Sequence, residues 1–190
     1  MLALILLSGT NLTAQTSELP YRVIPDYPES FTAETVAARM LDGLGFRYYW
    51  ATEGLRPEDL SYKPGEEARS TRETLEHIYG LTLLTVNSTK NVVNSRIDVS
   101  GLTFEELRAK TLENISKASE FLKGSEAALD DLKCIFPTQD GSTVDYPFWN
   151  LVNGPIADAL WHVGQVVSFR RSSGNPLNSK VSVFNGTVRD

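Results

Sequence analysis

The sequence is poor in the residues that build disulfides and cysteine-based metal sites. Cys134 is the only cysteine, which excludes an internal disulfide, a CxxC pair and a cysteine zinc cluster. A reactive thiol needs an electropositive setting that the neighbouring residues do not supply, so we expect Cys134 to be inert and partly buried. With 190 residues of ordinary globular composition, the chain is long enough for one domain with a core of its own.

The sequence also lacks an excess of basic residues and a long apolar run. The formal net charge is −6 and no cluster of Lys and Arg is visible, which argues against a nucleic-acid partner, because such binding depends on basic side chains that neutralise phosphates. The longest apolar stretch is far below the roughly 20 residues of a spanning helix, so we expect no membrane span.

Common catalytic signatures are missing as well. The chain contains no HExxH, GxSxG, GxGxxG or P-loop motif, and nothing anchors a Ser-His-Asp triad. A di-iron carboxylate bundle needs two ExxH motifs, and neither of the two histidines has a Glu three residues before it. Any catalytic or metal-binding activity of this chain must therefore come from a different arrangement of side chains.

The first fifteen residues, "MLALILLSGTNLTAQ", resemble the end of a secretory signal. No Lys or Arg precedes Arg22, so the basic start of a signal is missing, and a start chosen too far downstream would explain this. We expect residues 1–15 to be the signal peptide, complete or truncated at its start, of a periplasmic or secreted protein. The alternative is a disordered or loosely docked N-terminus on a cytoplasmic protein. Three prolines predict an extended arm over 16–31.

Apolar periodicity and end signals predict four long helices in the rest of the chain: 32–55, 71–93, 103–124 and 153–173. Capping boxes begin the second at Ser70 and the third at Thr103, and Asn153-Gly-Pro begins the fourth. Between the third and fourth of these helices, we expect a small hairpin or an ordered loop over residues 125–148. The expected fold is all-α, a four-helix bundle over 32–176 with an extended tail at 177–190.

A polar line on the fourth expected helix is the main functional signal. In "DALWHVGQVV", Asp158 and His162 are four residues apart and Gln165 continues the same face, within an otherwise apolar stretch. The other histidine, His77, lies in the second expected helix. A bundle can bring two such helices face to face, where imidazoles and a carboxylate could bind one ion and leave a position open. Two satisfied structural histidines are the alternative.

The segments "ARSTRETLEHIYG" and "DALWHVGQVVSFRRSSGNP" resemble the DinB-like (DinB/YfiT) superfamily of bacterial metal-dependent enzymes. The resemblance implies an up-down-down-up four-helix bundle that holds a divalent metal with a histidine of the second helix and an HxxxH pair of the fourth. It assigns His77 and His162 as ligands, with Asp158 where the family usually has its second histidine. Zinc is the first expectation, and two His with one carboxylate also suit Ni, Mn or Fe.

Other residues have weaker functional signals. Glu73, one turn before His77, is either a partner of the metal ligands or only part of the capping box. Gln165 could orient a ligand, and Gly164 is expected to allow close helix packing. Arg170 and Arg171 could hold an anionic substrate, although a favourable interaction with the helix C-terminus is the simpler explanation.

The functional expectation is therefore a divalent-metal-dependent transferase or hydrolase that acts on a small molecule. The resemblance to the DinB-like superfamily also implies low-molecular-weight thiol transfer as one branch of the reaction, and a homodimer is expected from the resemblance alone. The alternative function is an exported, non-catalytic helical bundle that binds a small ligand or a protein partner through the same cleft.

Overall fold

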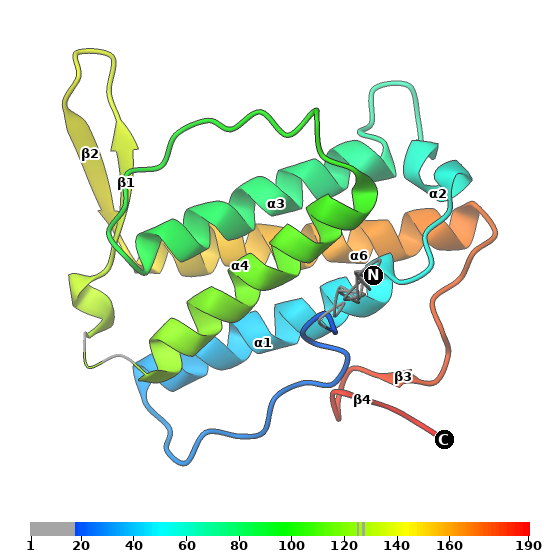
Figure 1. Cartoon of the computed structure of the whole chain (residues 1–190), viewed down its shortest axis with the longest axis horizontal. Coiled ribbons are helices and arrows are strands. Elements are labelled where there is room, and N and C mark those ends of the chain that lie inside the picture. Colours follow the sequence, from blue (N-terminus) through cyan, green and yellow to red (C-terminus); the bar gives the residue numbers. More distant parts are fainter. Residues whose placement is uncertain (1–17, 125, 127) are drawn as a thin grey trace, which may run out of the picture.

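The computed structural model describes residues 18–190 except 125 and 127, so the expected signal segment lies outside the described residues. The chain is mainly helical (Figure 1). Four long helices dominate: α1 (Ala33–Thr52), α3 (Thr71–Ser88), α4 (Phe104–Gly124) and α6 (Ala157–Ser172). Short helical segments lie between them: α2 (Pro57–Ser61), η1 (Leu129–Asp131), α5 (Trp149–Leu151) and η2 (Val152–Ile156). Two small antiparallel sheets pair β1 (Lys133–Pro137) with β2 (Thr143–Pro147) and β3 (Val181–Ser182) with β4 (Thr187–Val188).

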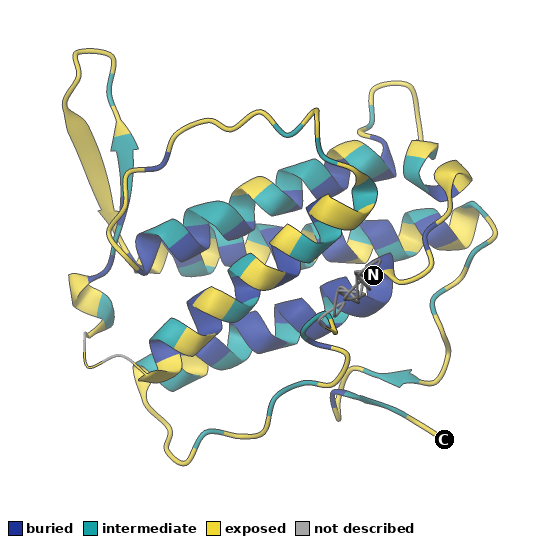
Figure 2. Ribbon diagram, viewed as in Figure 1, coloured by how far each residue is buried: buried dark blue, intermediate teal, exposed yellow. Residues whose placement is uncertain are grey.

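The four long helices pack around a shared apolar core. Helices α1 and α3 each contact both α4 and α6. The largest fully buried side chains come from α1, α3, α4 and the turns before α6, and they include Phe46, Tyr48, Leu75, Ile78, Leu112, Ile115, Leu151 and Ile156. Helix α6 contributes the smaller buried side chains of Ala159, Val163 and Val166. Figure 2 shows these buried stripes along the inward faces of the helices. Because α6 lies against both α1 and α3, it has two flanks on which a site can form.

The two capping boxes lie where the sequence predicts them. The Ser70 Oγ accepts a hydrogen bond from the Glu73 N–H at 3.2 Å, and the Glu73 carboxylate accepts one from the Ser70 N–H at 2.7 Å. Thr103 and Glu106 repeat this exchange at the start of α4. Each box satisfies backbone N–H groups that the first helical turn leaves without a partner.

The helix expected over 71–93 ends earlier, at Ser88. Asn91 has a positive φ of 52°, which a helix cannot continue through. The chain then runs beside the hairpin, where the backbone N–H of Asn94 donates to the carbonyl of Ile135 at 2.8 Å. A contact between residues distant in the sequence therefore replaces the last expected turn of this helix. The spacing of apolar residues, which is a local pattern, could not predict that contact.

The start of the last long helix also differs from the prediction. Asn153 is not an N-cap, because helical turns already begin at Trp149 and continue through η2 into α6. Gly154, with φ −95° and ψ −107°, makes a kink directly before Pro155. Proline has no N–H to give to the preceding turn, so the chain bends there instead of beginning a new helix.

The predicted hairpin forms over residues 133–147, and the all-α expectation holds only for the larger part of the described chain. β1 and β2 pair in register from Lys133 opposite Pro147 to Pro137 opposite Thr143. Gly141, with φ 84°, completes the turn between them. The C-terminal tail adds the β3–β4 pair, and the carbonyl of Gly186 accepts a hydrogen bond from Ile24 of the N-terminal arm. In the part of the chain described here, no helix is long and apolar enough to cross a bilayer.

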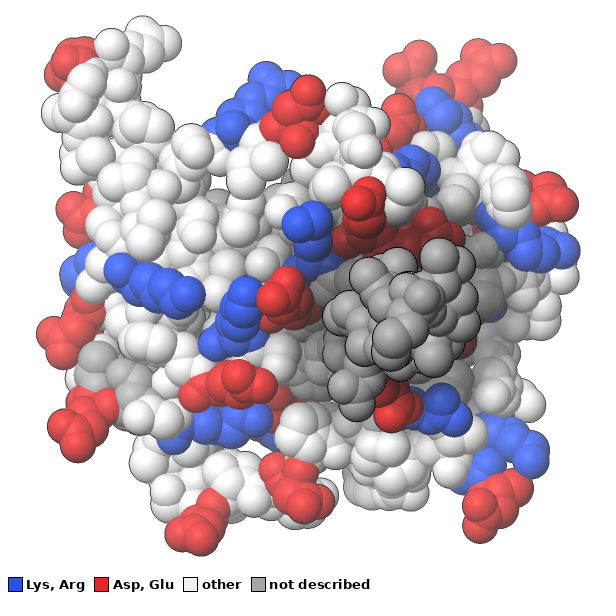
Figure 3. Space-filling view, viewed as in Figure 1, with Lys and Arg blue, Asp and Glu red and all other residues white. Residues whose placement is uncertain are grey.

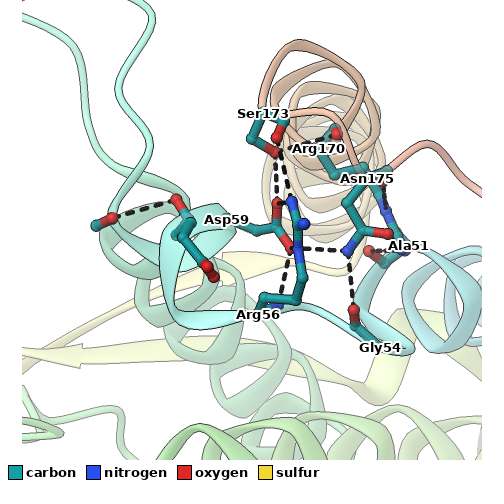
Figure 4. Close-up of polar contacts among 9 residues, drawn as sticks. Ala51, Gly54, Arg56, Asp59, Arg170, Ser173 and Asn175 are labelled. Atoms are coloured by element: carbon teal, nitrogen blue, oxygen red, sulfur yellow. Dashed lines mark hydrogen bonds and ion pairs between the residues drawn. The ribbon is translucent and has the colours of Figure 1, made fainter.

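A buried carboxylate joins α2 to the end of α6 (Figure 4). Asp59 is fully buried and accepts hydrogen bonds from the Arg56 guanidinium and backbone N–H, the Ser173 hydroxyl and the Asn175 amide. Hydrogen bonding from Arg56, helped by Ser173 and Asn175, holds the pKa of Asp59 far below its usual value near 3.8. The ionised form is therefore part of the folded structure.

We expect this group to make the fold sensitive to acid. Since the pKa of Asp59 is lowered by folding, its stabilisation is complete above the unfolded-state value of 3.8 and is lost as the pH falls towards the folded-state value. Urea unfolding from about pH 5 to about pH 2 should show Asp59→Asn to be about 2 kcal/mol less stable than wild type at the upper end, with a smaller difference at the lower end. Equal differences across that range would contradict this account.

Candidate metal centre

The adjacent helices α3 and α6 bring His77, Asp158 and His162 together. The Nε2 of His77 lies 3.2 Å from Oδ2 of Asp158, and the Nε2 of His162 lies 3.3 Å from Oδ1 of the same carboxylate. The two imidazole rings are 4.7 Å apart between centroids and almost perpendicular, at 87°. One ligand atom from each residue lies within 4.8 Å of the others, so the group could hold a metal ion.

Gln165 fixes the orientation of His162. A Gln165 amide turned the other way would donate to Nδ1 and leave the ring hydrogen on Nε2. In the orientation of the structure, the side-chain oxygen lies 2.7 Å from Nδ1 of His162, so Nδ1 carries the hydrogen of this bond. In a neutral imidazole, Nε2 then presents a lone pair, and that lone pair faces the Asp158 carboxylate at 3.3 Å. Two electron-rich atoms at this distance need a proton or a cation between them. A divalent metal fulfils this requirement, and a protonated His162 is the alternative.

The types of donor suit a small divalent ion, and their spacing can be compared with that around a bound ion. Metal–ligand bonds of about 2.0–2.1 Å in a tetrahedral site give ligand–ligand distances of about 3.3–3.4 Å. The two His–Asp distances, 3.2 and 3.3 Å, are close to this, but they end on different oxygens of the carboxylate, and one ligand atom from each of the three residues lies within 4.8 Å of the others. Two imidazoles and one carboxylate form a three-ligand set of the kind that leaves a coordination position open.

The group is partly open to solvent. The side chain of His162 is 12% exposed, whereas His77 and Asp158 are exposed by 33% and 36%. Trp161 stacks on the His162 ring, with the two planes 15° apart, and its own side chain is mostly exposed. Water or a small molecule can therefore reach the group from one side, while the helices close the other.

Glu73 does not join this group. Its carboxylate accepts the Ser70 N–H and forms an ion pair with Lys63 at 3.5 Å, and both contacts lower its pKa. The capping role explains Glu73, and the structure does not bring it to the histidines. Of the two residues expected to support the ligands, the geometry joins only Gln165 to them.

Gly164 and Arg170 of α6 differ from expectation. Trp161, on the same helix, lies on the surface against His162. Gly164 does not serve close packing, since a Cβ placed there would have no neighbour within 4 Å. Arg170 is buried and donates to the Trp50 and Ala51 carbonyls at the end of α1. The position of Arg170 in an apolar stretch was the available signal that it is buried. Its partners Trp50 and Ala51 are too distant in the sequence to be inferred.

The geometry thus joins His77, Asp158, His162 and Gln165 in one cluster on two neighbouring helices. Comparison with protein-family models, with curated proteins and with solved structures found no match.

Proposed function

We propose that this protein is a metal-dependent enzyme that binds one divalent ion through His77, Asp158 and His162. The observation that carries the proposal is the Gln165 contact, because it turns the lone pair of His162 Nε2 towards a carboxylate. Zinc is the first candidate, and Ni, Mn or Fe(II) suit the same ligands. The reaction class is transfer or hydrolysis of a small molecule.

We further propose that the fold is the up-down-down-up bundle of the DinB-like superfamily. The order of the chain supports this proposal: in Figure 1 the colours run in one direction along α1 and α6 and in the other along α3 and α4. The ring of contacts among the four helices supports it too. The motif "HVGQ" contributes His162 and Gln165, and Asp158 replaces the usual second histidine.

Each side chain has a definite task in the proposed chemistry. His77 and His162 supply neutral nitrogen donors from separate helices, and Asp158 supplies a negative charge between them. Gln165 holds the His162 ring in one tautomer and one rotamer. A bound divalent ion supplies Lewis acidity, which lowers the pKa of a coordinated water or thiol and makes it a nucleophile near neutral pH.

Metal content tests the proposal directly. Purified protein equilibrated with Zn, Ni, Mn or Fe(II) and then desalted should retain about one ion per chain, as a three-ligand site requires. His77→Ala and His162→Ala should abolish this retention, and Gln165→Leu should lower affinity by about 10- to 100-fold. Trp161→Phe is the control, because it keeps an aromatic ring on His162 and removes no ligand.

Two results would contradict the proposal. A wild-type protein that retains no stoichiometric metal would remove the basis for a metalloenzyme and leave the exported, non-catalytic binding bundle as the better account. A His77→Ala or His162→Ala variant that holds metal as tightly as wild type would show that the ligand assignment is wrong. Export itself rests on the apolar start of the sequence, and fractionation of the producing cells tests it.

A further inference from the structure

A second site lies on the other flank of α6, between α6, α1 and the C-terminal segment. A groove of about 690 Å³ opens there, a volume typical of small-molecule pockets. Figure 1 shows the segment that carries β3 and β4 running beside α1, and Val181 and Val183 of that segment line the groove. The groove is therefore formed by segments from both ends of the chain.

The groove is separate from the candidate metal centre. Helical spacing places Leu160 and Val167, which line the groove, close to half a turn around α6 from His162. The metal ligands face α3, whereas the groove faces α1. The two sites can thus be tested independently on one protein.

Three arginines line the groove, and none of its lining residues is acidic: Arg39, Arg47 and Arg171. In the described part of the chain, none of the three forms an ion pair with a carboxylate. This is unusual for a chain with a net charge of −6, and on the face drawn in Figure 3 basic and acidic side chains are interspersed. The groove is thus a concentration of positive charge on an acidic protein.

Two of the arginines are held in place by local contacts. The Nη1 of Arg39 donates to the Pro25 carbonyl at 2.6 Å, and its guanidinium lies over the Tyr27 ring. The Nη1 of Arg47 donates to the Gly43 carbonyl at 2.9 Å. These bonds occupy only part of each guanidinium, which has five N–H donors. The remaining donors suit an anionic group, because guanidinium matches the geometry of carboxylate and phosphate.

The rest of the groove is apolar. Its walls include Met40, Trp50, Leu160 and Val163. Gly164 opens the α6 side, since a Cβ at that position would meet no atom within 4 Å. A free inorganic anion would leave these walls without a partner, whereas a molecule with an apolar body would cover them.

We propose that this groove binds a small amphipathic carboxylate, with its anionic group at Arg47 and Arg171 and its apolar body against Trp50 and the α6 wall. The arginines favour a ligand with an anionic group, and the apolar lining favours a ligand with an apolar body. The proposal is independent of the metal centre, because no metal ligand lines the groove.

Calorimetric titration with decanoate tests this proposal, below its micelle-forming concentration and with chelator present so that metal does not contribute. Wild-type protein should bind decanoate saturably at one site. Decanol, which lacks the charge, and inorganic phosphate, which lacks the apolar body, should each bind at least about tenfold more weakly. Equal binding of decanoate and decanol, or tighter binding of phosphate than of decanoate, would overturn the proposal.

Variants locate the binding. Arg47→Met and Arg171→Met should each weaken decanoate binding about tenfold, as expected for the loss of one charge-assisted hydrogen bond. Arg69→Met is the matched control, because it removes the same charge from an exposed loop outside the groove. Gly164→Leu should block binding by filling the groove, without a clash for its Cβ. The same loss in Arg69→Met, or unchanged binding in Gly164→Leu, would show that decanoate binds elsewhere.

Discussion

Replacing Arg170 with Met is expected to lower the free energy of unfolding by about 3 to 5 kcal/mol. Arg170 is only 4% exposed, and its guanidinium donates to the carbonyls of Trp50 and Ala51 at 3.0 Å each and to the carbonyl of Asn175 at 2.7 Å. The first two are at the end of α1, where helix carbonyls lack partners within the helix. Met has a similar length and fills most of the same space. The loss of stability therefore comes mainly from the α1 carbonyls that no longer have a hydrogen-bond donor, and less from a cavity.

The charge of Arg170 adds to this expectation. Burial lowers the pKa of its guanidinium, while the nearby Asp59 carboxylate opposes that effect, so the two groups stabilise each other's charged forms (Figure 4). Removing Arg170 therefore also leaves Asp59 with less compensation. Thermal unfolding followed by circular dichroism should show the midpoint lower by roughly 10 °C.

Arg171→Met is the matched control for this experiment, since it changes the same residue type one position later on the exposed side of α6. It should alter stability by no more than about 0.5 kcal/mol. An Arg170→Met protein that loses less than about 1 kcal/mol would mean that water replaces the guanidinium at the α1 carbonyls, and the description of Arg170 as a cap of α1 would then be wrong.

The features that the sequence predicted well are those with local causes. The starts of α3 and α4 follow from Ser70 and Thr103, whose caps involve only the next three residues. The hairpin turn follows from Asp140-Gly141 for the same reason. By contrast, the early end of α3 depends on a hydrogen bond to Ile135, which no local pattern contains.

The same distinction holds for the functional sites. Asp158, His162 and Gln165 are one helical turn apart, so their proximity could be derived from spacing alone. His77 could be added only as one possible pairing of two helices in a bundle, and the family resemblance then assigned it as a ligand, because helix pairing cannot be read from one sequence. The groove escaped prediction because its walls come from α1, α6 and the tail, and because Gly164 marks a space that only the assembled fold defines.

If the proposed metal centre is correct, Asp158→Asn should lower affinity for a divalent metal by about 100-fold or more, since it replaces a charged oxygen of the proposed ligand set with a neutral amide. The effect should exceed that of Gln165→Leu, because Asp158 lies against both histidines, at 3.2 and 3.3 Å, whereas Gln165 contacts only one. Competition titration against a chromophoric chelator measures the change. Asp145→Asn, on an exposed strand, is the control for the loss of one negative charge.

Asp158→His tests whether this position holds a metal ligand. It restores the histidine of the resembling family and should keep tight binding of zinc, while weakening binding of Mn, because imidazole suits zinc and carboxylate oxygen suits Mn. If Asp158→Asn binds metal as tightly as wild type, Asp158 is not a ligand and its contacts with the histidines are ordinary ion pairs. If instead Asp158→His loses zinc while Asp158→Asn keeps it, the backbone at this position does not support the proposed centre. Retention of zinc by Asp158→His and its loss by Asp158→Asn would together assign the carboxylate as a ligand that a histidine can replace.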